Sequence, residues 1–140
     1  MKNCENVMVS ACLLGVNCKY NGGNNNNEEL LKLLKNKNVI PICPEIYGGL
    51  PTPRIPSEIK NGKVINKSNI DVTMQFEKGA SETLKLAQKL NVKIAYLKQN
   101  SPSCGLGSIY DGTFSGNKIP GDGVTAKLLK ENGIKIISVK

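Results

Sequence analysis

Three of the five cysteines follow apolar, strand-like runs, and their thiols together could bind a soft metal. Each comes just past the end of such a run: Cys12 after residues 7–10, Cys43 after residues 39–42 and Cys104 after residues 94–97. Helix-like segments separate the runs, which indicates parallel strands joined by crossovers. Because ligands bind at the carboxyl edge of such a sheet, we expect the three thiols to meet there.

The ligand types favour an iron–sulfur cluster or zinc, since the chain contains no histidine. Structural zinc normally takes four ligands in closely spaced pairs. The only near pair here is Cys12 and Cys18, with a longer gap of five residues between them. A cubane cluster held by three cysteines leaves one iron free to act as a Lewis acid on a substrate atom.

Several alternatives remain open for the cysteines. Cys18 is near enough to Cys12 to be a fourth ligand, and is otherwise a spectator thiol or a sulfur acceptor. Cys4 lies near the terminus, and we expect it to be outside the site. All three strand-end cysteines could instead be apolar core residues, as buried cysteines often are.

Four polar side chains near these cysteines are candidates for the remaining chemistry. Glu45 is two residues after Cys43, behind a proline expected to keep the backbone extended. With no histidine, this carboxylate is the best candidate proton carrier, although it could simply cap a loop. Ser101 and Ser103 could hydrogen-bond to substrate or to a cluster sulfide, or only form a turn. Arg54, the single arginine, could bind a carbonyl or phosphate, or form a structural salt bridge.

The alternation of segments predicts one α/β domain over residues 1–140, with a mostly parallel, Rossmann-like sheet flanked by helices. The expected strands are 7–10, 39–42, 93–98 and 134–138. The longest helix is expected at 73–91, where apolar residues recur at helical spacing. The metal site should lie at the carboxyl ends of the strands.

Capping and turn residues give more local predictions. Asn27 is expected to cap a short helix that buries the leucines at 30, 31, 33 and 34. Asn61-Gly62 predicts a tight hairpin turn. A glycine-rich loop is expected over 110–123, and Asp122 is expected to cap a last helix.

Composition excludes several classes of protein. The longest apolar runs fall well short of the roughly 20 residues that cross a bilayer, and residues 1–6 lack the apolar run of a secretion signal. We therefore expect a cytoplasmic protein with reduced thiols and no membrane partner. The net charge of +8 is nearly all lysine, and aromatic residues are only 4% of the chain. That pattern indicates a solvated lysine surface, with attraction for a nucleotide or RNA as the alternative.

The motifs resemble those of the thiouracil desulfidase family. The matching segments are Ser10-Ala11-Cys12-Leu13-Leu14-Gly15, Cys43-Pro44-Glu45, Gly48-Gly49-Leu50-Pro51-Thr52-Pro53-Arg54, Asp71-Val72-Thr73, Ser101-Pro102-Ser103-Cys104-Gly105 and Ile109-Tyr110-Asp111-Gly112-Thr113-Phe114, with Gly121 to Ala126 behind them. The resemblance covers nearly the whole chain in order, which makes it highly specific.

The resemblance implies a 4Fe–4S enzyme that removes sulfur from thiolated uracil without net redox change. It places the cluster ligands at Cys12, Cys43 and Cys104, the acidic catalytic residue at Glu45 and a catalytic serine at Ser101. By the resemblance, an open iron would bind the substrate sulfur. From their chemistry and their place near the cysteines, we also expect Ser103 and Arg54 to contact the substrate.

The substrate and the role of Cys18 are less closely defined by the resemblance. Cys18 falls where many relatives have no cysteine, so the resemblance does not include it among the ligands. The expected substrate is a small thiolated base, and thiouridine in tRNA is the alternative. A metal-stabilised protein without catalysis is the other hypothesis, and the sequence defines no oligomeric state.

Overall fold

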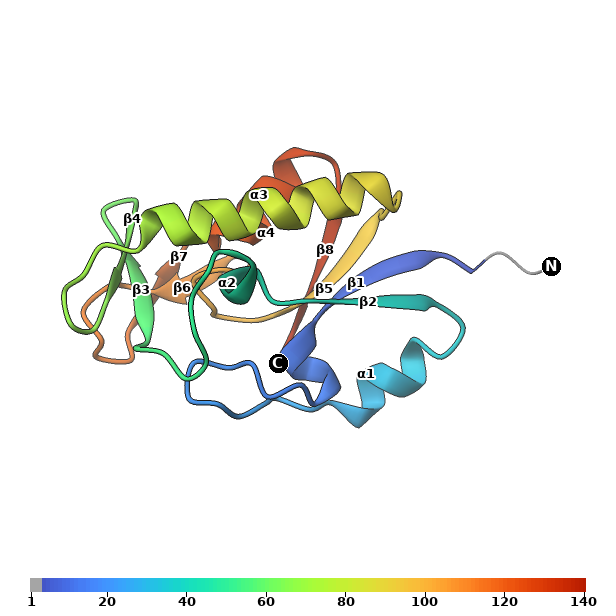
Figure 1. The fold of residues 1–140 in the computed structure, drawn as a ribbon, viewed down its shortest axis with the longest axis horizontal. Coiled ribbons are helices and arrows are strands. Elements are labelled where there is room, and N and C mark those ends of the chain that lie inside the picture. Colours follow the sequence, from blue (N-terminus) through green and yellow to red (C-terminus); the bar gives the residue numbers. More distant parts are fainter. Residues whose placement is uncertain (1–3) are drawn as a thin grey trace.

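The computed structural model describes residues 4–140, which form an α/β fold around a four-stranded parallel sheet (Figure 1). The sheet order is β2-β1-β5-β8, and every neighbouring pair is parallel. Its strands are β1 (Asn6–Ser10), β2 (Asn38–Ile42), β5 (Ile94–Lys98) and β8 (Lys135–Val139). The predicted fold class is confirmed, and all four strands lie where the apolar runs placed them. Residues 1–3, which begin the polar N-terminal stretch considered above, are outside the described part.

Helices cover both faces of this sheet, so its central strand is buried on both sides. α3 (Thr73–Lys89) and α4 (Val124–Glu131) pack on one face, and α1 (Glu28–Leu33) lies on the other (Figure 1). In β1, Met8 belongs to the core on the α3–α4 side, whereas Val7 and Val9 belong to the core on the α1 side. Within residues 4–140, no helix has the length and apolar character needed to cross a bilayer.

The order of the strands creates a crevice at one end of the sheet. From central β1 the chain passes through α1 to the edge strand β2, then returns across β1 to β5 and β8. The winding direction therefore reverses between β1 and β5, and such a switch point leaves an opening at the carboxyl ends of the strands. Pro41 is tolerated inside β2 because an edge strand needs hydrogen bonds on one side only.

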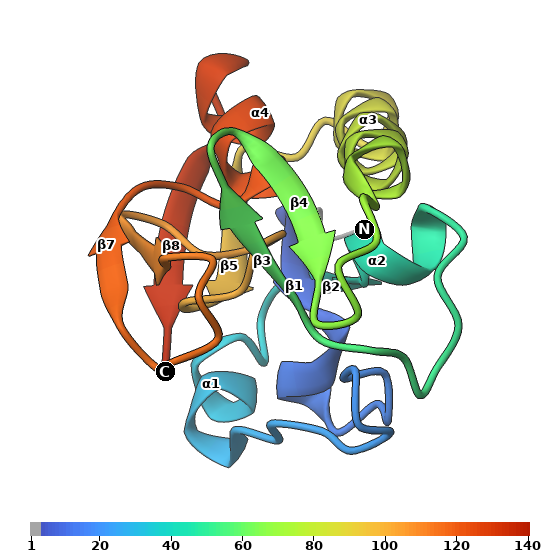
Figure 2. The ribbon, with the colours of Figure 1, turned by 90° about the vertical axis from the view of Figure 1, so that its left-hand side faces the viewer.

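Two antiparallel hairpins extend the molecule beyond this crevice (Figure 2). β3 (Ser57–Lys60) and β4 (Lys63–Asn66) are joined by Asn61-Gly62, whose φ angles of 52° and 77° are those a tight hairpin turn requires. This predicted turn is confirmed. β6 (Ser108–Tyr110) and β7 (Lys118–Pro120) form the second hairpin, which contacts the first through β3 and β6. The loop expected over 110–123 is therefore partly wrong, because β6 ends at its first residue and β7 lies within it.

Two local predictions also need correction. Asn27 caps α1 as expected, because its side chain accepts the Leu30 N–H. Of the four leucines, however, only Leu30 and Leu34 are buried, and Leu33 is 69% exposed because one face of the helix is turned to solvent. Asp122 does not cap α4. Gly123 occupies the cap position, while the Asp122 carboxylate accepts the Gly107 N–H at 2.7 Å and pairs with Lys130 at 3.1 Å.

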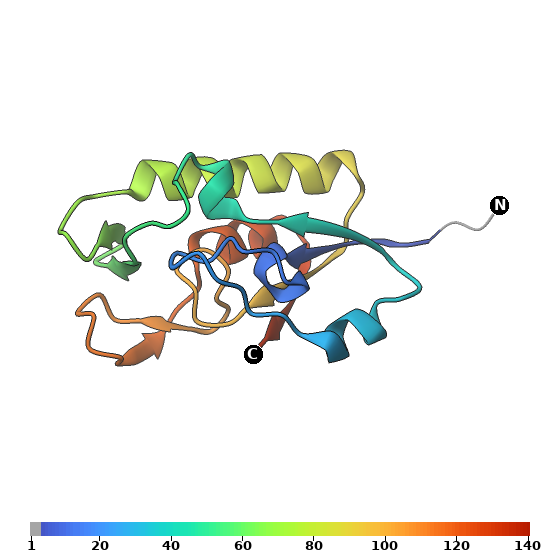
Figure 3. The ribbon, with the colours of Figure 1, turned by 60° about the horizontal axis from the view of Figure 1, so that its bottom comes forward.

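The segment after Cys43 forms a short helix, α2 (Pro44–Tyr47), and is not extended as expected. Proline fits the first turn of a helix, where its missing N–H is not needed. α2 packs directly against α3 (Figure 3), with backbone against backbone at two glycines. A Cβ on Gly79 would stand 1.9 Å from the Pro44 carbonyl oxygen, and one on Gly48 would stand 1.9 Å from the Gln75 carbonyl oxygen.

This close contact gives a stability prediction. Replacing an interior helical glycine by alanine normally stabilises a helix by about 1 kcal/mol. Gly79→Ala should instead lower the free energy of unfolding by about 2 kcal/mol, because α2 must move away from α3. Urea unfolding measures the change, and Ser81→Ala, at an exposed position of the same helix, is the matched control. A stabilised Gly79→Ala protein would contradict the described packing.

Candidate metal centre

A cavity of about 570 Å³ opens at the carboxyl ends of β1, β2 and β5. All seven residues that the sequence singled out for function line it, and Cys18 does too: Cys12, Cys18, Cys43, Glu45, Arg54, Ser101, Ser103 and Cys104. Cys4 precedes β1, and its carbonyl accepts a hydrogen bond from Asn38 at the amino end of β2. Cys4 is thus at the other end of the sheet, near the amino ends of the strands. The other four cysteines all line the cavity.

Each of the three strand-end cysteines is held by a different local structure. Cys12 lies in a 3-10 turn over Ala11–Leu14, directly after β1. Cys43 is the cap residue of α2, directly after β2. Cys104 is in the turn that follows β5, and this turn is fixed by Gly105, whose N–H binds the Ser101 carbonyl at 2.9 Å. The parallel strands therefore bring together three segments that are far apart in sequence.

Cys18 lies between Cys12 and Cys43 and alters the acidity of both. Its thiol lies beside both of theirs and favours their thiolate forms, so the pKa of Cys12 falls to about 6 and the pKa of Cys43 to about 7. The same two neighbours raise the pKa of Cys18 far above its ordinary value. Cys12 and Cys43 thus carry much of the thiolate character that metal ligation requires, while Cys18 keeps its proton.

Other donors surround the sulfur atoms. Asn25, which the sequence did not single out within its run of four asparagines, donates its side-chain amide to Cys12 Sγ at 3.4 Å. The Ser103 hydroxyl lies 3.7 Å from Cys104 Sγ. Burial raises the pKa of Cys104 to about 12, against the opposing effect of the Ser10 and Ser103 hydroxyls. Hydrogen bonds to ligand sulfurs are a usual feature of iron–sulfur sites.

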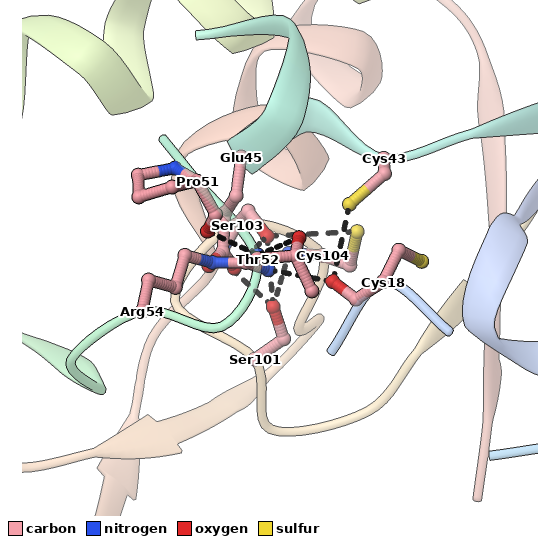
Figure 4. A network of polar contacts seen from close by, with 9 residues as sticks. All are labelled: Cys18, Cys43, Glu45, Pro51, Thr52, Arg54, Ser101, Ser103 and Cys104. Atoms are coloured by element: carbon pink, nitrogen blue, oxygen red, sulfur yellow. Dashed lines mark hydrogen bonds and ion pairs between the residues drawn. The ribbon is translucent and has the colours of Figure 1, made fainter. Parts of the chain in front are cut away.

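A chain of hydroxyl groups leads to Glu45 (Figure 4). Ser103 Oγ donates to Glu45 Oε2 at 2.9 Å, and it lies 2.9 Å from Ser101 Oγ. A carboxylate can only accept, so Ser101 is the donor to Ser103 when Glu45 is ionised. Ser101 Oγ also accepts the backbone N–H groups of Ser103 and Cys104. Ser103, rather than Ser101, is thus in direct contact with the carboxylate.

Arg54 fixes the other side of Glu45 (Figure 4). Its Nε donates to Glu45 Oε1 at 2.9 Å, and its Nη2 donates to the Cys18 carbonyl at 2.9 Å. Nη1 binds Thr52 Oγ1 at 3.0 Å and the Pro51 carbonyl at 3.2 Å. The structure therefore shows the salt bridge that was the alternative for Arg54, whereas its direct contact with a substrate stays a prediction.

The thiols of the cavity are not gathered around one point. In the part of the chain that is described, no group of three or more His, Cys, Asp or Glu side chains is arranged to hold a single metal ion. Thiolates around one zinc must stand about 4 Å apart, because the Zn–S bond is about 2.3 Å. A cluster binds each thiolate to a different iron and so accepts more widely spaced ligands. Cysteine thiolates are the ordinary ligands of iron–sulfur clusters, so the chemistry of the donors in this cavity fits such a cluster.

The fold and the site define an α/β protein with a thiol-lined cavity at its switch point, and comparison with known proteins identifies the family. The model of the 2-thiouracil desulfurase family matches residues 7–140, and the chain belongs to this family. The chain is 46% identical over 142 residues to the Bacillus subtilis (strain 168) protein titled "Uncharacterized protein YbbK", covering 94% of each chain. The match confirms the resemblance to the thiouracil desulfidase family that the sequence motifs indicated.

A solved structure agrees with this assignment. The chain is similar to the 4Fe–4S-dependent thiouracil desulfidase TudS, with 40% sequence identity and a TM-score of 0.88. The match covers 96% of this chain and 90% of TudS.

The ion pair between Arg54 and Glu45 is largely buried, with side-chain exposures of 6% and 16%. Arg54→Met should therefore lower the free energy of unfolding by roughly 3 kcal/mol, because it leaves a buried carboxylate without its partner. Adding Glu45→Gln to Arg54→Met should restore part of the loss. Urea unfolding of the two single variants and the double variant measures the coupling.

Lys37→Met is the matched control, since it breaks the exposed pair between Lys37 and Glu5, whose side chains are 37% and 40% exposed. It should cost less than about 1 kcal/mol. Equal losses for Arg54→Met and Lys37→Met would show that the pair at the cavity contributes no more than a surface contact.

Proposed function

We propose that this protein removes sulfur from a thiolated uracil, giving uracil and sulfide, at a 4Fe–4S cluster bound by Cys12, Cys43 and Cys104. The observation that carries the proposal is that three thiols and a hydrogen-bonded carboxylate line one cavity. Membership of the 2-thiouracil desulfurase family and the similarity to TudS support it. The proposal places the protein in the reducing cytoplasm, where such thiols persist.

The cavity residues fit the proposed cluster by their chemistry. Thiolates are soft ligands suited to iron–sulfur clusters; the Asn25 amide donates to Cys12, and the Ser10 and Ser103 hydroxyls lie beside Cys104. When bound, a cluster held by three cysteines supplies a Lewis-acidic iron to the substrate sulfur. Cys18 is assigned to the surroundings of the ligands: its thiol lies beside those of Cys12 and Cys43 and favours their thiolate forms, and its carbonyl is held by Arg54.

The overall reaction replaces sulfur by oxygen and needs proton transfer but no electrons. Water adds to the carbon that carries sulfur and gives up its protons, and the sulfur leaves as sulfide with one proton or two. Glu45 is the proposed proton carrier, because its carboxylate lines the cavity and is oriented on both oxygens. Atoms and charge balance without an oxidant or reductant.

The two serines take different parts in this proposal. Ser103 donates to Glu45 Oε2 and so can pass a proton between the carboxylate and a bound water. Ser101, the serine that the resemblance implies, reaches Glu45 through Ser103 and holds the Ser103 hydroxyl in place. Arg54 keeps the carboxylate turned towards Ser103.

Thiouridine in tRNA is a second candidate substrate, favoured by the lysines that line the cavity. Lys19, Lys67 and Lys98 all contribute to its wall. Binding of tRNA should weaken steeply as salt is raised, whereas turnover of a free base should not. Comparing salt dependence with 2-thiouracil and with thiolated tRNA distinguishes the two substrates.

The direct test is sulfide release from 2-thiouracil by anaerobically reconstituted protein. We expect catalytic release of sulfide together with equimolar uracil. Fully loaded protein that turns over neither 2-thiouracil nor thiolated tRNA would contradict the proposal. In that case the cluster would serve only to stabilise the fold.

The ligand assignment predicts unequal effects of cysteine substitution. Cys12→Ala, Cys43→Ala and Cys104→Ala should each abolish stable iron binding, because each removes a cluster ligand. Cys18→Ala should retain near-normal iron, and Cys4→Ala, at the other end of the sheet, is the control. Iron and acid-labile sulfide per chain are the measurements. Loss of iron in Cys18→Ala as complete as in Cys43→Ala would show four protein ligands.

The role of Glu45 can be separated from cluster assembly. Glu45→Gln keeps the size of the side chain but removes its ionisable group. Iron content and visible absorption should stay unchanged, while turnover per cluster falls about a hundredfold or more. Ser101→Ala should cause a smaller loss, since it removes one positioning hydrogen bond. Near-normal turnover in Glu45→Gln would exclude the carboxylate as proton carrier.

A further inference from the structure

The loop between β6 and β7 forms a part of the cavity wall that the proposed chemistry does not use. Phe114 and Gly116 from this loop, and Tyr110 at the end of β6, line the cavity together with Glu58 of β3. This wall comes from the two hairpins, whereas the thiols come from the ends of the parallel strands. The hairpins thus add a separate surface to the site.

Phe114 has an unusual backbone conformation. Its φ is 56°, in the left-handed region that bulky side chains rarely adopt. The other non-glycine residues of the described chain with positive φ are all asparagines, which tolerate this region: Asn61, Asn69, Asn91 and Asn100. Strained backbone of this kind is associated with functional sites, where the surrounding structure enforces it.

Glu58 enforces the conformation of the loop. Its Oε1 accepts the Gly112 N–H at 3.0 Å and the Phe114 N–H at 3.1 Å. Gly112, with φ of 92°, brings the loop so close to β3 that a Cβ there would stand 2.6 Å from Lys60 Cβ. Asp111 Oδ1 accepts the Thr113 N–H at 2.9 Å and closes the turn between them. The position of Phe114 is therefore fixed by one carboxylate and one close backbone approach.

Phe114 is one of three aromatic residues that line the cavity, and it is the one in the loop held by Glu58. The ring of Tyr110 lies under Lys118, whose Nζ is 5.7 Å from the ring centre. Tyr20 is 44% exposed, and only its backbone carbonyl, which binds the Arg54 N–H, is held in place. Phe114 is half-buried and lines the cavity, and its side chain offers the cavity a wholly apolar aromatic surface.

We propose that Phe114 is the surface on which the flat ring of the substrate stacks, and that Glu58 is the residue that positions it. The inference rests on the proposed function and extends it by assigning ring recognition to the β6–β7 loop. A uracil ring offers two flat faces, and base–aromatic stacking is a general means of binding it. Recognition of the ring is thus separate from the residues that hold the metal and move the proton.

The test compares Phe114→Leu and Phe114→Tyr in cluster-loaded protein, with 2-thiouracil as substrate. Phe114→Leu removes the aromatic face, and we expect KM to rise roughly tenfold or more while kcat changes little. Phe114→Tyr keeps the face and should restore KM. Asn117→Ala, exposed in the same loop, is the matched control.

A non-planar substrate separates stacking from simple filling of space. Wild-type protein should prefer 2-thiouracil over 5,6-dihydro-2-thiouracil, and Phe114→Leu should reduce that preference by a similar factor. Glu58→Ala should raise KM as Phe114→Leu does, while Glu58→Gln, which keeps the accepting oxygen, should restore most of the loss. Glu77→Ala, an exposed glutamate on α3, controls for the change of charge.

Either of two results would overturn the inference: an unchanged KM in Phe114→Leu, or an equal effect on planar and non-planar substrates. If Phe114→Leu fails to fold, Phe114→Tyr, Glu58→Ala and Glu58→Gln still test the inference. The measurements are again KM and the preference for the planar over the non-planar substrate. If loaded wild-type protein released no sulfide, the proposed function itself would fail, and this inference would fail with it.

Discussion

The salt bridge between Arg54 and Glu45 connects the segments that form the site. Through one guanidinium, the carboxylate of α2, the carbonyl of Cys18 and the 51–52 segment are held at fixed positions. The backbone N–H of Arg54 also binds the Tyr20 carbonyl at 2.7 Å, which ties the loop after Cys12 to the same point. Because Glu45 then binds Ser103, the turn that carries Cys104 joins this network. The buried ion pair and its hydrogen bonds therefore link the segments that carry Cys18, Glu45 and Cys104.

The parallel sheet explains why these segments meet. Three strands end at one edge, and the reversal of winding between β1 and β5 leaves space there for a cavity. The residue that precedes α4 also supports the cavity. Gly123 lies so close to the Ser103 carbonyl that a Cβ on it would stand 2.6 Å away. α2 is supported in a similar way, by its glycine contact with α3. Close backbone packing on both sides thus limits movement of the Cys43 and Cys104 segments.

Much of this arrangement could be predicted from the sequence, because strands and ligands follow short-range patterns. The runs before Cys12, Cys43 and Cys104 indicated the strands, and parallel connection indicated that they converge. Side-chain pairing was harder, since it depends on how loops cross in space. Nothing in the sequence selected Ser103 over Ser101 as the contact of Glu45, or Asn25 among four asparagines as the donor to Cys12. The conformation of Phe114 was also hidden, because Glu58 lies 56 residues earlier in the chain.

The central claim is that three cysteines of this cavity hold a 4Fe–4S cluster that acts on a thiolated uracil. The most direct measurement is the Mössbauer spectrum of protein reconstituted anaerobically with ⁵⁷Fe, recorded with and without 2-thiouracil. Three protein ligands predict that about a quarter of the iron differs from the rest and changes its signal when 2-thiouracil is added. A spectrum in which all the iron is alike and unaffected by 2-thiouracil would contradict the account.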